Sequence, residues 1–287
     1  MNIKTSFSHR SQEPENSVLY LVGTPIGNLN DISLRAINIL KNVSLIACED
    51  TRQTSKIMKK YEITNHLISF NKENSFKKIP TIIKNLKEGK SIALVSDAGM
   101  PSICDPGEDL VKDAKNSGIG IICIPGPCAA ITALVSSGMG SSSFVFEGFL
   151  PKKKILRGKI LMEISKSRKT IVLFESPHRL IKLLKELKDY CGGEREIQVF
   201  RELTKKFEEH IGRNIDEVLE FFQNKEILGE ITIVIRAFQK TDDTDIDIFQ
   251  LRIELNELIN AGLSLSAASK YLAKKNNLKK SLIYSLY

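Results

Sequence analysis

The chain lacks tryptophan, and only 7% of its 287 residues are aromatic. It also lacks long apolar runs: residues 1–17 are polar and mixed in charge, and apolar stretches elsewhere last only a few residues. Neither a signal peptide nor a membrane-spanning helix is therefore expected. With 42% apolar and 26% charged residues, the composition is typical of a soluble globular protein, and the length predicts about two domains.

Cysteines are few and scattered. None is spaced as Cys-X-X-Cys, and their number is odd: Cys48, Cys104, Cys123, Cys128 and Cys191. This pattern predicts reduced thiols and a cytoplasmic location. The four histidines are isolated from one another and from the cysteines, so no metal site is expected. The P-loop, dinucleotide-binding, nucleophile-elbow and zinc-protease motifs are absent, which argues against those chemistries.

Positive charge exceeds negative charge by eight, and much of this excess lies at the C-terminus. The segment Ser264–Tyr287 contains no acidic residue but five lysines, namely Lys270, Lys274, Lys275, Lys279 and Lys280. An acidic stretch, Thr241–Asp247, precedes it. The basic segment is either a solvated helical cap or a surface that binds RNA.

The first half of the chain alternates short β-branched runs with longer amphipathic stretches, which predicts βα units and a parallel sheet. Strands are expected at Val18–Val22, Ser44–Cys48, His66–Phe70, Ser91–Val95 and Gly120–Ile124. Helices are expected to begin near Asp31, Gln53, Ser75, Pro106 and Gly126. Asp31 is predicted to cap the first helix, with Leu34, Ile37 and Leu40 on its inner face.

The second half predicts another α/β domain with a mixed sheet, because several strands follow one another without a helix between them. Its strands are expected at Phe144–Glu147, Thr170–Phe174, Ile197–Arg201, Phe207–Ile211 and Ile231–Arg236, and its helices at Ile155–Lys166, Pro177–Tyr190 and Ile215–Phe222. The glycine- and serine-rich segment Ser136–Ser143 predicts the domain boundary. The predicted divisions are a flexible segment (1–17), two α/β domains (18–138 and 139–240), an acidic linker (241–249) and a basic helical tail (250–287).

Three loops rich in glycine and proline each follow a predicted strand of the first domain. Their sequences are GTPIGNL, SDAGMPSICDPG and PGPCAA. Loops at the carboxyl ends of strands line the ligand crevice of an open α/β sheet, and glycine allows the backbone to approach a ligand closely. Three such loops predict one bound small molecule.

Together with LIACEDTR, FEGFLP, LFESPHRL and RELTK, these loops resemble the bacterial small-subunit ribosomal RNA cytidine 2′-O-methyltransferases of the tetrapyrrole-methylase superfamily. The resemblance extends from about Val18 to Arg236, and the tail resembles the family's helix-turn-helix-like segment. It implies two class III methyltransferase α/β domains with S-adenosyl-L-methionine in the cleft between them. It also implies a homodimer that methylates 16S ribosomal RNA in the small ribosomal subunit, with no membrane partner.

The resemblance implies a cofactor site and an RNA-binding set. The cofactor site comprises Pro25, Ile26, Asp97, Ala98, Gly99, Met100, Ile103, Cys128, Ala129, Glu175 and Leu203. The RNA-binding set is Lys205 with the five C-terminal lysines. Met100 departs from the threonine usual in the family, and Leu228 stands where lysine is common before Gly-Glu. Met100 removes a side-chain hydroxyl contact but would leave a backbone contact intact.

Methylation of a ribose hydroxyl needs a base, or a cation that stabilises the forming alkoxide. Candidates lie at predicted strand ends in the family-like segments: Glu49, Asp50, Arg52, Glu175, His178, Arg179, Arg201 and Glu202. The carboxylates are the preferred bases and the arginines the preferred phosphate or alkoxide partners. Strand-end charges equally form structural salt bridges between domains, and His178 equally caps a helix. Cys128 is expected only to pack beside the cofactor.

Two other functions remain open at this point. One is a methyltransferase that acts on a tetrapyrrole or another small molecule, and the other is a non-catalytic RNA-binding factor of ribosome assembly. The EDTR, ESPHR and RELTK segments and the basic tail favour RNA over a small molecule. The three intact loops favour an enzyme over a vestigial cleft.

Overall fold

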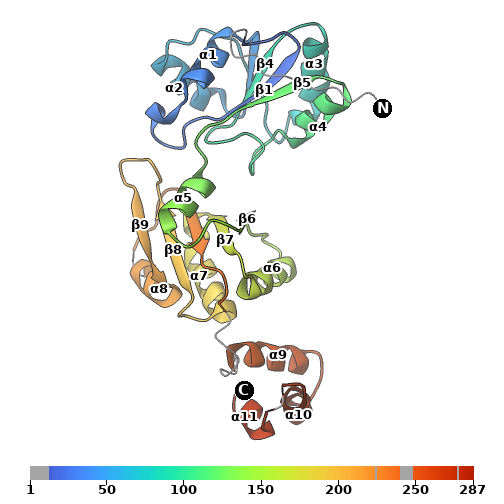
Figure 1. Cartoon of the computed structure of the whole chain (residues 1–287), viewed down its shortest axis with the longest axis vertical. Helices are drawn as coiled ribbons and strands as arrows, with labels where there is room; N and C mark the ends of the chain where they lie inside the picture. The colour runs from blue at the N-terminus through green and yellow to red at the C-terminus, as the bar shows by residue number, and fades with distance from the viewer. Residues whose placement is uncertain (1–12, 224, 240–247, 277) are drawn as a thin grey trace.

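The computed structural model describes residues 13–223, 225–239, 248–276 and 278–287. In this part of the chain, two five-stranded sheets and a group of three helices follow one another along the longest axis (Figure 1). Most of the predicted N-terminal segment 1–17 and most of the linker 241–249 lie outside the described residues. None of the helices in the described ranges combines the length and the hydropathy of a bilayer-crossing segment.

The first sheet is entirely parallel, as predicted, with the strand order β3-β2-β4-β1-β5. Its strands are β1 (Val18–Val22), β2 (Leu45–Cys48), β3 (Leu67–Ser69), β4 (Ile92–Val95) and β5 (Gly120–Ile124). Each agrees with its predicted strand to within about one residue at either end, because apolar runs bounded by turn residues mark strands clearly.

Helices cover both faces of this sheet. On one face lie α1 (Leu34–Asn42) and α2 (Thr51–Lys60), and on the other lie α3 (Ser75–Lys87) and α4 (Glu108–Asn116). Successive residues of β1 point to opposite faces: Tyr20 joins the α1 and α2 core, and Leu19 joins the core beneath α3 and α4. The loops that follow the carboxyl ends of the strands form the ligand edge of such a sheet.

The predicted start of the first helix is wrong by one short turn. Asp31 ends a 3-10 helix, η1 (Leu29–Asp31), and Ser33 is the N-cap of α1, accepting a hydrogen bond from the Ala36 N–H at 3.1 Å. Leu34, which was predicted on the inner face of this helix, is 86% exposed. The buried positions of α1 are Ala36, Ile39 and Leu40.

The second sheet is mixed, as predicted, with the order β6-β7-β10-β8-β9. Its strands are β6 (Phe144–Phe149), β7 (Thr170–Glu175), β8 (Glu196–Arg201), β9 (Glu209–Asn214) and β10 (Ile231–Ile235). Only β6 and β7 pair in parallel. β9 begins later than predicted, because Phe207 belongs to the loop between β8 and β9 rather than to the strand.

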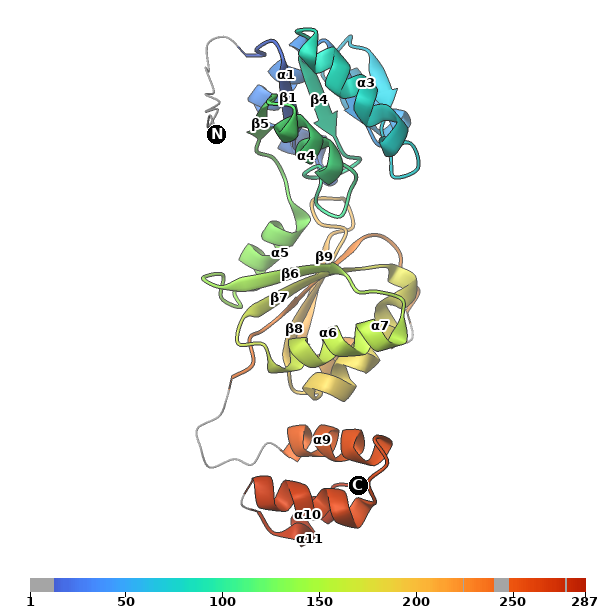
Figure 2. The same ribbon diagram turned by 90° about the vertical axis from the view of Figure 1, so that its right-hand side faces the viewer.

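The two faces of the second sheet are covered differently (Figure 2). One face carries α6 (Lys154–Lys166), α7 (Pro177–Cys191) and α8 (Ile215–Gln223), and the other carries α5 (Ala129–Ser137). Ala133 and Leu134 of α5 pack in the cluster that contains Val172 of β7. By its packing, α5 belongs with the second sheet, although the glycine- and serine-rich segment predicts a boundary after this helix. The apolar face of α5 decides its position, and the segment that follows it is a loop within the second unit.

The C-terminal region contains α9 (Ile248–Asn260), α10 (Leu265–Lys275) and α11 (Lys280–Tyr284). These helices share a core of their own, to which Leu255, Leu272 and Ile283 contribute fully buried side chains. Every member of that cluster comes from these helices and the residues directly joined to them. The predicted basic tail is therefore a small helical unit with its own core.

Candidate functional site

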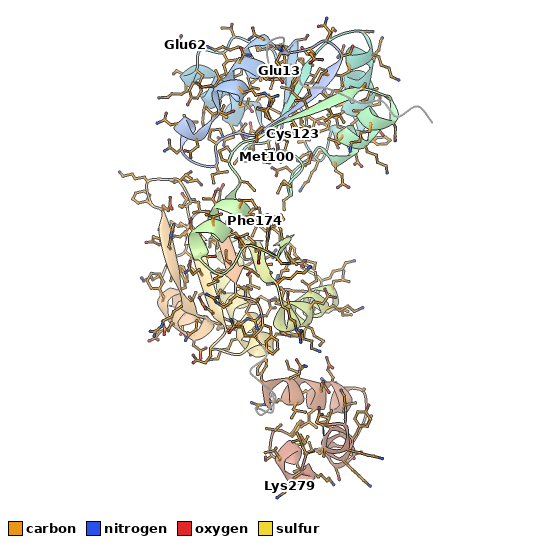
Figure 3. The ribbon with its side chains drawn as sticks, viewed as in Figure 1. Glu13, Glu62, Met100, Cys123, Phe174 and Lys279 are labelled. Atoms are coloured by element: carbon orange, nitrogen blue, oxygen red, sulfur yellow. The ribbon has the colours of Figure 1, made fainter. Side chains whose placement is uncertain are left out.

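A cavity of about 210 Å³ lies between the carboxyl edge of the first sheet and the second sheet. Its walls come from the loops after β1, β4 and β5 and from the ends of β6, β7 and β10. Figure 3 shows Met100 at the edge of the first unit and Phe174 at the facing edge of the second. The lining residues are Ile26, Ala98, Gly99, Met100, Ile103, Cys104, Asp105, Cys128, Ala129, Phe149, Phe174, Glu230 and Thr232.

The loops after β1 and β5 approach so closely that only glycine fits at their contact. A Cβ atom on Gly23 would lie 2.7 Å from Gly126 Cα and 2.7 Å from Met100 Sδ. The loop after β4 is joined to the loop after β1 by paired hydrogen bonds between Thr24 and Gly99, at 2.9 and 3.1 Å. The three loops therefore form one connected wall of the cavity, with Gly99 itself in a left-handed conformation (φ 79°).

Two loops near the cavity contain left-handed residues other than glycine. Ser102 and Cys104 follow β4, with φ 71° and 65°, and Glu202 and Thr204 follow β8, with φ 54° and 64°. Such conformations cost about 1–3 kcal/mol each and persist where surrounding contacts hold them, often at functional sites. Both loops make contacts between the two units that hold them in place.

Contacts across the cavity tie the first unit to the second. The Cys104 sulfur lies beside β6, only 2.9 Å from where a Cβ on Gly148 would be. On another side, the Asn28 N–H donates to Thr204 Oγ1 at 3.1 Å. A Cβ on the neighbouring Gly27 would collide with Lys205 at 2.4 Å. Close packing at these two places fixes the position of one cavity wall relative to the other.

Most of the cofactor-site residues implied by the resemblance line this cavity. They are Ile26, Ala98, Gly99, Met100, Ile103, Cys128 and Ala129. Pro25, Asp97 and Leu203 lie next to lining residues without lining the cavity themselves. Asp97 accepts a hydrogen bond from the Asp50 N–H at 2.9 Å, and Leu203 packs with Ile26 in the core beneath α5.

Glu175 lies away from the cavity, in an internal ion-pair network. Its side chain is fully buried, and both of its oxygens bind Arg179, at 2.9 Å each. Arg157 approaches the same carboxylate at 3.5 Å and also pairs with Glu186 at 2.6 Å. The network connects β7, α6 and α7 within the second unit. Its charges compensate one another, so the geometry gives Glu175 and Arg179 a structural role.

The catalytic candidates of the first domain are Glu49, Asp50 and Arg52, at the edge of the sheet, and hydrogen bonds join Asp50 to Asp97 and to Arg52. Asp50 caps α2 through the Arg52 N–H and also binds the Arg52 guanidinium at 2.6 Å. The hydrogen bond from Arg52 lowers the pKa of Asp50 to about 2. Burial, together with the nearby charges of Asp105 and Asp97, raises the pKa of Glu49. None of these three predicted catalytic side chains lines the cavity.

The second-domain candidates form a separate cluster around Lys205. Its Nζ donates to Glu202 at 2.8 Å and to Glu230 at 3.0 Å. Burial alone would raise the pKa of Glu202, but hydrogen bonds from Lys205 and from the Glu230 N–H lower it. Arg201 pairs with Glu209 at 2.8 Å, across from it on the neighbouring strand β9. Among these residues only Glu230, which was not predicted, lines the cavity.

His178 lies in the first turn of α7, exposed, and does not line the cavity. Ser176 is the N-cap of that helix, so His178 does not cap it. The sequence also left six lining residues unpredicted: Cys104, Asp105, Phe149, Phe174, Glu230 and Thr232. Cys104 and Asp105 stand in the glycine-rich loop after β4, directly after Ile103, the last residue predicted from that loop. The other four lie at strand ends of the second sheet, which only the fold brings to the cavity.

A family model described as tetrapyrrole (corrin/porphyrin) methylases matches residues 18–219, which is more than half of the chain. The chain belongs to the tetrapyrrole methylase family. The match covers the first sheet, all strands of the second sheet except β10, and all three loops of the cavity.

This methylase is also similar over nearly its whole length to curated relatives named ribosomal RNA small subunit methyltransferase I. The relative from Bacillus subtilis is 41% identical over 286 residues, covering 98% of this chain and 97% of its own. The relative from Synechocystis is 40% identical over 269 residues, covering 94% and 96%. The shorter relative from Thermotoga maritima is 46% identical and matches 76% of this chain with 97% of its own length.

Solved structures show the same fold. A cobalt precorrin-4 methyltransferase has a TM-score of 0.60 at 16% identity, covering 77% of this chain and 95% of its own. A uroporphyrin-III C-methyltransferase from Thermus thermophilus, solved with S-adenosyl homocysteine, has a TM-score of 0.55 at 16% identity, covering 75% and 96%. The predicted two-domain class III fold of this methylase is therefore confirmed.

The cavity residues fit the cofactor of a methylase. Gly99, with its left-handed backbone, presents main chain rather than a side chain to the cavity. Ile26, Met100 and Phe149 form apolar walls suited to an adenine ring, and Asp105 and Glu230 supply negative charge for a cationic ligand. S-adenosylmethionine combines an aromatic ring with positive charge.

Proposed function

We propose that this methylase transfers a methyl group from S-adenosyl-L-methionine to the ribose 2′-hydroxyl of a cytidine in small-subunit ribosomal RNA. The observation that carries the proposal is the cavity itself: the three family-like loops meet there, in a chain whose relatives are named for this ribosomal substrate. We expect the reaction to take place in the cytoplasm, with the chain acting as a homodimer.

The three loops would hold the cofactor through their backbone, with Ile26, Met100 and Ala129 against its apolar parts. When bound, S-adenosylmethionine supplies a methyl group attached to a positively charged sulfur, which is a good leaving group. The residues around it orient the reaction and exclude water. Holding the attacking oxygen about 3 Å from the methyl carbon supplies much of the rate enhancement.

The C-terminal helices supply a surface for the RNA backbone. Lys270 and Lys274 are exposed one turn apart on α10, with the half-exposed Tyr271 beside them. Lys275 donates to Glu254 at 2.7 Å and Lys280 to Ser266 at 2.8 Å, so these two lysines are partly engaged within the unit. Exposed lysines beside an aromatic side chain suit phosphates and an unstacked base.

The proposal is tested by offering the full-length protein radiolabelled S-adenosylmethionine together with undermethylated small ribosomal subunits, naked small-subunit RNA or a tetrapyrrole. We expect label in the RNA, recovered after alkaline hydrolysis in a resistant dinucleotide, because a 2′-O-methyl group blocks cleavage of the adjoining phosphodiester. Label on the tetrapyrrole alone would establish the small-molecule alternative. Transfer to none of the three, with RNA binding retained, would establish a non-catalytic factor.

A further inference from the structure

We propose that Asp105 is the base that removes the proton from the ribose 2′-hydroxyl. The inference rests on the proposed function and adds the catalytic residue that the sequence does not identify. It starts from the cavity wall: among the described residues that line it, only Asp105 and Glu230 carry a carboxylate. The eight catalytic candidates predicted from the sequence all lie outside this wall.

Glu230 is the weaker of the two candidates. Its Oε2 accepts a hydrogen bond from Lys205 at 3.0 Å, and its N–H donates to Glu202 at 2.9 Å. The Glu230 carboxylate is therefore already held in an ion pair with Lys205. Lys205 in turn is fixed between Glu202 and Glu230. These three side chains are better suited to hold the loop between β8 and β9 against the cavity wall.

Three of the carboxylates predicted as catalytic bases are excluded from that role because each is paired with a cation. Glu175 is buried between two arginines within the second unit, and Asp50 is bound to Arg52. Glu202 is bound to Lys205. Each of these three acids is already neutralised by a cation, and each lies outside the cavity wall.

Asp105 differs from all of them. In the described part of the chain, no lysine or arginine nitrogen comes within ion-pair distance of its carboxylate. The neighbouring Ser96 hydroxyl donates to the Ala98 and Gly99 carbonyls at 3.3 and 3.4 Å. The charged and titratable groups that face it are Lys72, Asp97, Glu49 and Cys104. Lys72 is held nearby by a hydrogen bond from its Nζ to the Cys104 carbonyl at 3.2 Å.

Burial raises the pKa of Asp105, and the negative charge of Asp97 adds to this, whereas Ser96 and Lys72 act in the opposite direction. A carboxylate with a raised pKa is a stronger base and is better matched to neutral pH. The left-handed backbone at Ser102 and Cys104 fixes the direction in which the loop presents the next residue, Asp105.

The proton transfer balances without any further reactant. The O–H bond of the ribose hydroxyl breaks, and its proton moves to the Asp105 carboxylate. The oxygen's electron pair forms the new bond to the methyl carbon, while the bond between that carbon and sulfur breaks and its electron pair stays on the sulfur. Product release returns the proton from Asp105 to water.

Three variants test this assignment in full-length protein: Asp105→Asn, Asp105→Glu and, as a matched control, Asp113→Asn. Asp105→Asn keeps the shape of the side chain and removes its charge, and Asp113 is exposed on α4 away from the cavity. The measurements are the single-turnover rate of methyl transfer to undermethylated small subunits and, separately, the calorimetric affinity for S-adenosyl homocysteine.

We expect Asp105→Asn to lower the single-turnover rate by about 10²- to 10⁴-fold, which is the usual contribution of a positioned base. Affinity for S-adenosyl homocysteine, whose sulfur carries no positive charge for Asp105 to attract, should change far less than the rate. Asp105→Glu should restore part of the rate, and Asp113→Asn should match the unaltered protein. A rate for Asp105→Asn close to that of the unaltered protein overturns the inference. So does a loss that weaker cofactor binding fully accounts for.

The pH profile of the unaltered protein gives a test that needs no variant. Because only the ionised carboxylate accepts a proton, the single-turnover rate should rise with pH as Asp105 ionises, above the ordinary range of an aspartate, and then level off. The same rise should persist in Glu230→Gln and disappear from the residual rate of Asp105→Asn. A rise that moves with Glu230→Gln instead overturns the assignment, whereas failure of the unaltered protein to methylate RNA overturns the proposed function itself.

Discussion

Arginine pairs decide what several acidic side chains of this methylase can do. Glu175 stands at the end of β7, where a ligand site was expected, yet Arg157 and Arg179 enclose its carboxylate. The Ser176 N–H donates to the same group at 2.8 Å. A buried carboxylate with this many donors stabilises the junction of β7, α6 and α7, and removing its charge would leave two arginines short of a partner.

Replacing Glu175 with glutamine is therefore expected to destabilise the fold by about 3–5 kcal/mol, because an unpaired buried charge is costly. Urea denaturation followed by circular dichroism measures the free energy of unfolding. Glu217→Gln, at a surface position of α8 outside this network, should change it by no more than about 0.5 kcal/mol. A stable Glu175→Gln protein with impaired cofactor binding would instead support the ligand role that the resemblance implied.

At the scale of secondary structure, capping residues determine where helices begin and hence which side chains they bury. Two of the polar residues that precede α1 act as caps at different turns: Asn28 accepts from the Asn30 N–H in η1, whereas Ser33 caps α1. Asp31 does neither of these. The sequence predicted Asp31 as the cap, and the packing of Ile39 against the sheet core selects Ser33.

Ser33→Ala should destabilise the protein by about 0.5–2 kcal/mol, which is the usual cost of losing an N-cap. Asp31→Ala should have a much smaller effect, because this exposed residue does not cap α1. Thermal and urea denaturation of the two variants compare these effects directly. A larger loss for Asp31→Ala than for Ser33→Ala would contradict the observed start of α1.

Strand ends and loops explain the success and the limits of the sequence predictions for the cavity. The loops after β1, β4 and β5 were predicted because glycine and proline mark them and because parallel strands bring their ends together. Phe149, Phe174 and Thr232 carry no such signal: each looks like an ordinary strand residue. They reach the cavity because antiparallel pairing places the start of β10 beside the end of β7.

At the scale of the whole molecule, the C-terminal helices form a unit whose core is separate from the methylase body. Leu251 and Leu255 of α9 pack in the same cluster as Leu272 and Ile283. A cut at Ser264 would divide this core, whereas a cut after residue 239 removes the unit intact. The shorter Thermotoga maritima relative matches only 76% of this chain, which shows that a relative of the same name need not have this chain's full length.

Removing residues 240–287 should weaken binding to small-subunit RNA and flatten its salt dependence, since each lost phosphate contact lowers the slope by about 0.7–0.9. Affinity for S-adenosyl homocysteine should stay the same, because the cavity contains no described residue beyond Thr232. Filter binding over a range of salt concentrations and calorimetry measure the two effects. A variant with Lys270, Lys274 and Lys279 changed to glutamine should reproduce the RNA effect without disturbing the helical core.

An equal loss of RNA and cofactor binding in the truncated protein would show that the helical unit supports the body instead of binding RNA. Full RNA affinity in the triple glutamine variant, together with a loss in the truncated protein, would place the RNA contact elsewhere on the unit. Either outcome would contradict the proposed role of Lys270, Lys274 and Lys279 in binding RNA.

The sequence by itself determined the two α/β units, nearly every strand, the three cavity loops and the family, because these depend on local patterns of apolar, glycine and proline residues. Only the tertiary structure decided which charged residues can act at the cavity. The chemistry of a charged side chain depends on the groups around it in space. Glu175 and Asp50 pair with arginines, and Glu202 and Glu230 pair with Lys205. Asp105 has no paired cation in the described chain. Tertiary packing likewise assigned α5 to the second sheet and made the basic tail a unit with its own core.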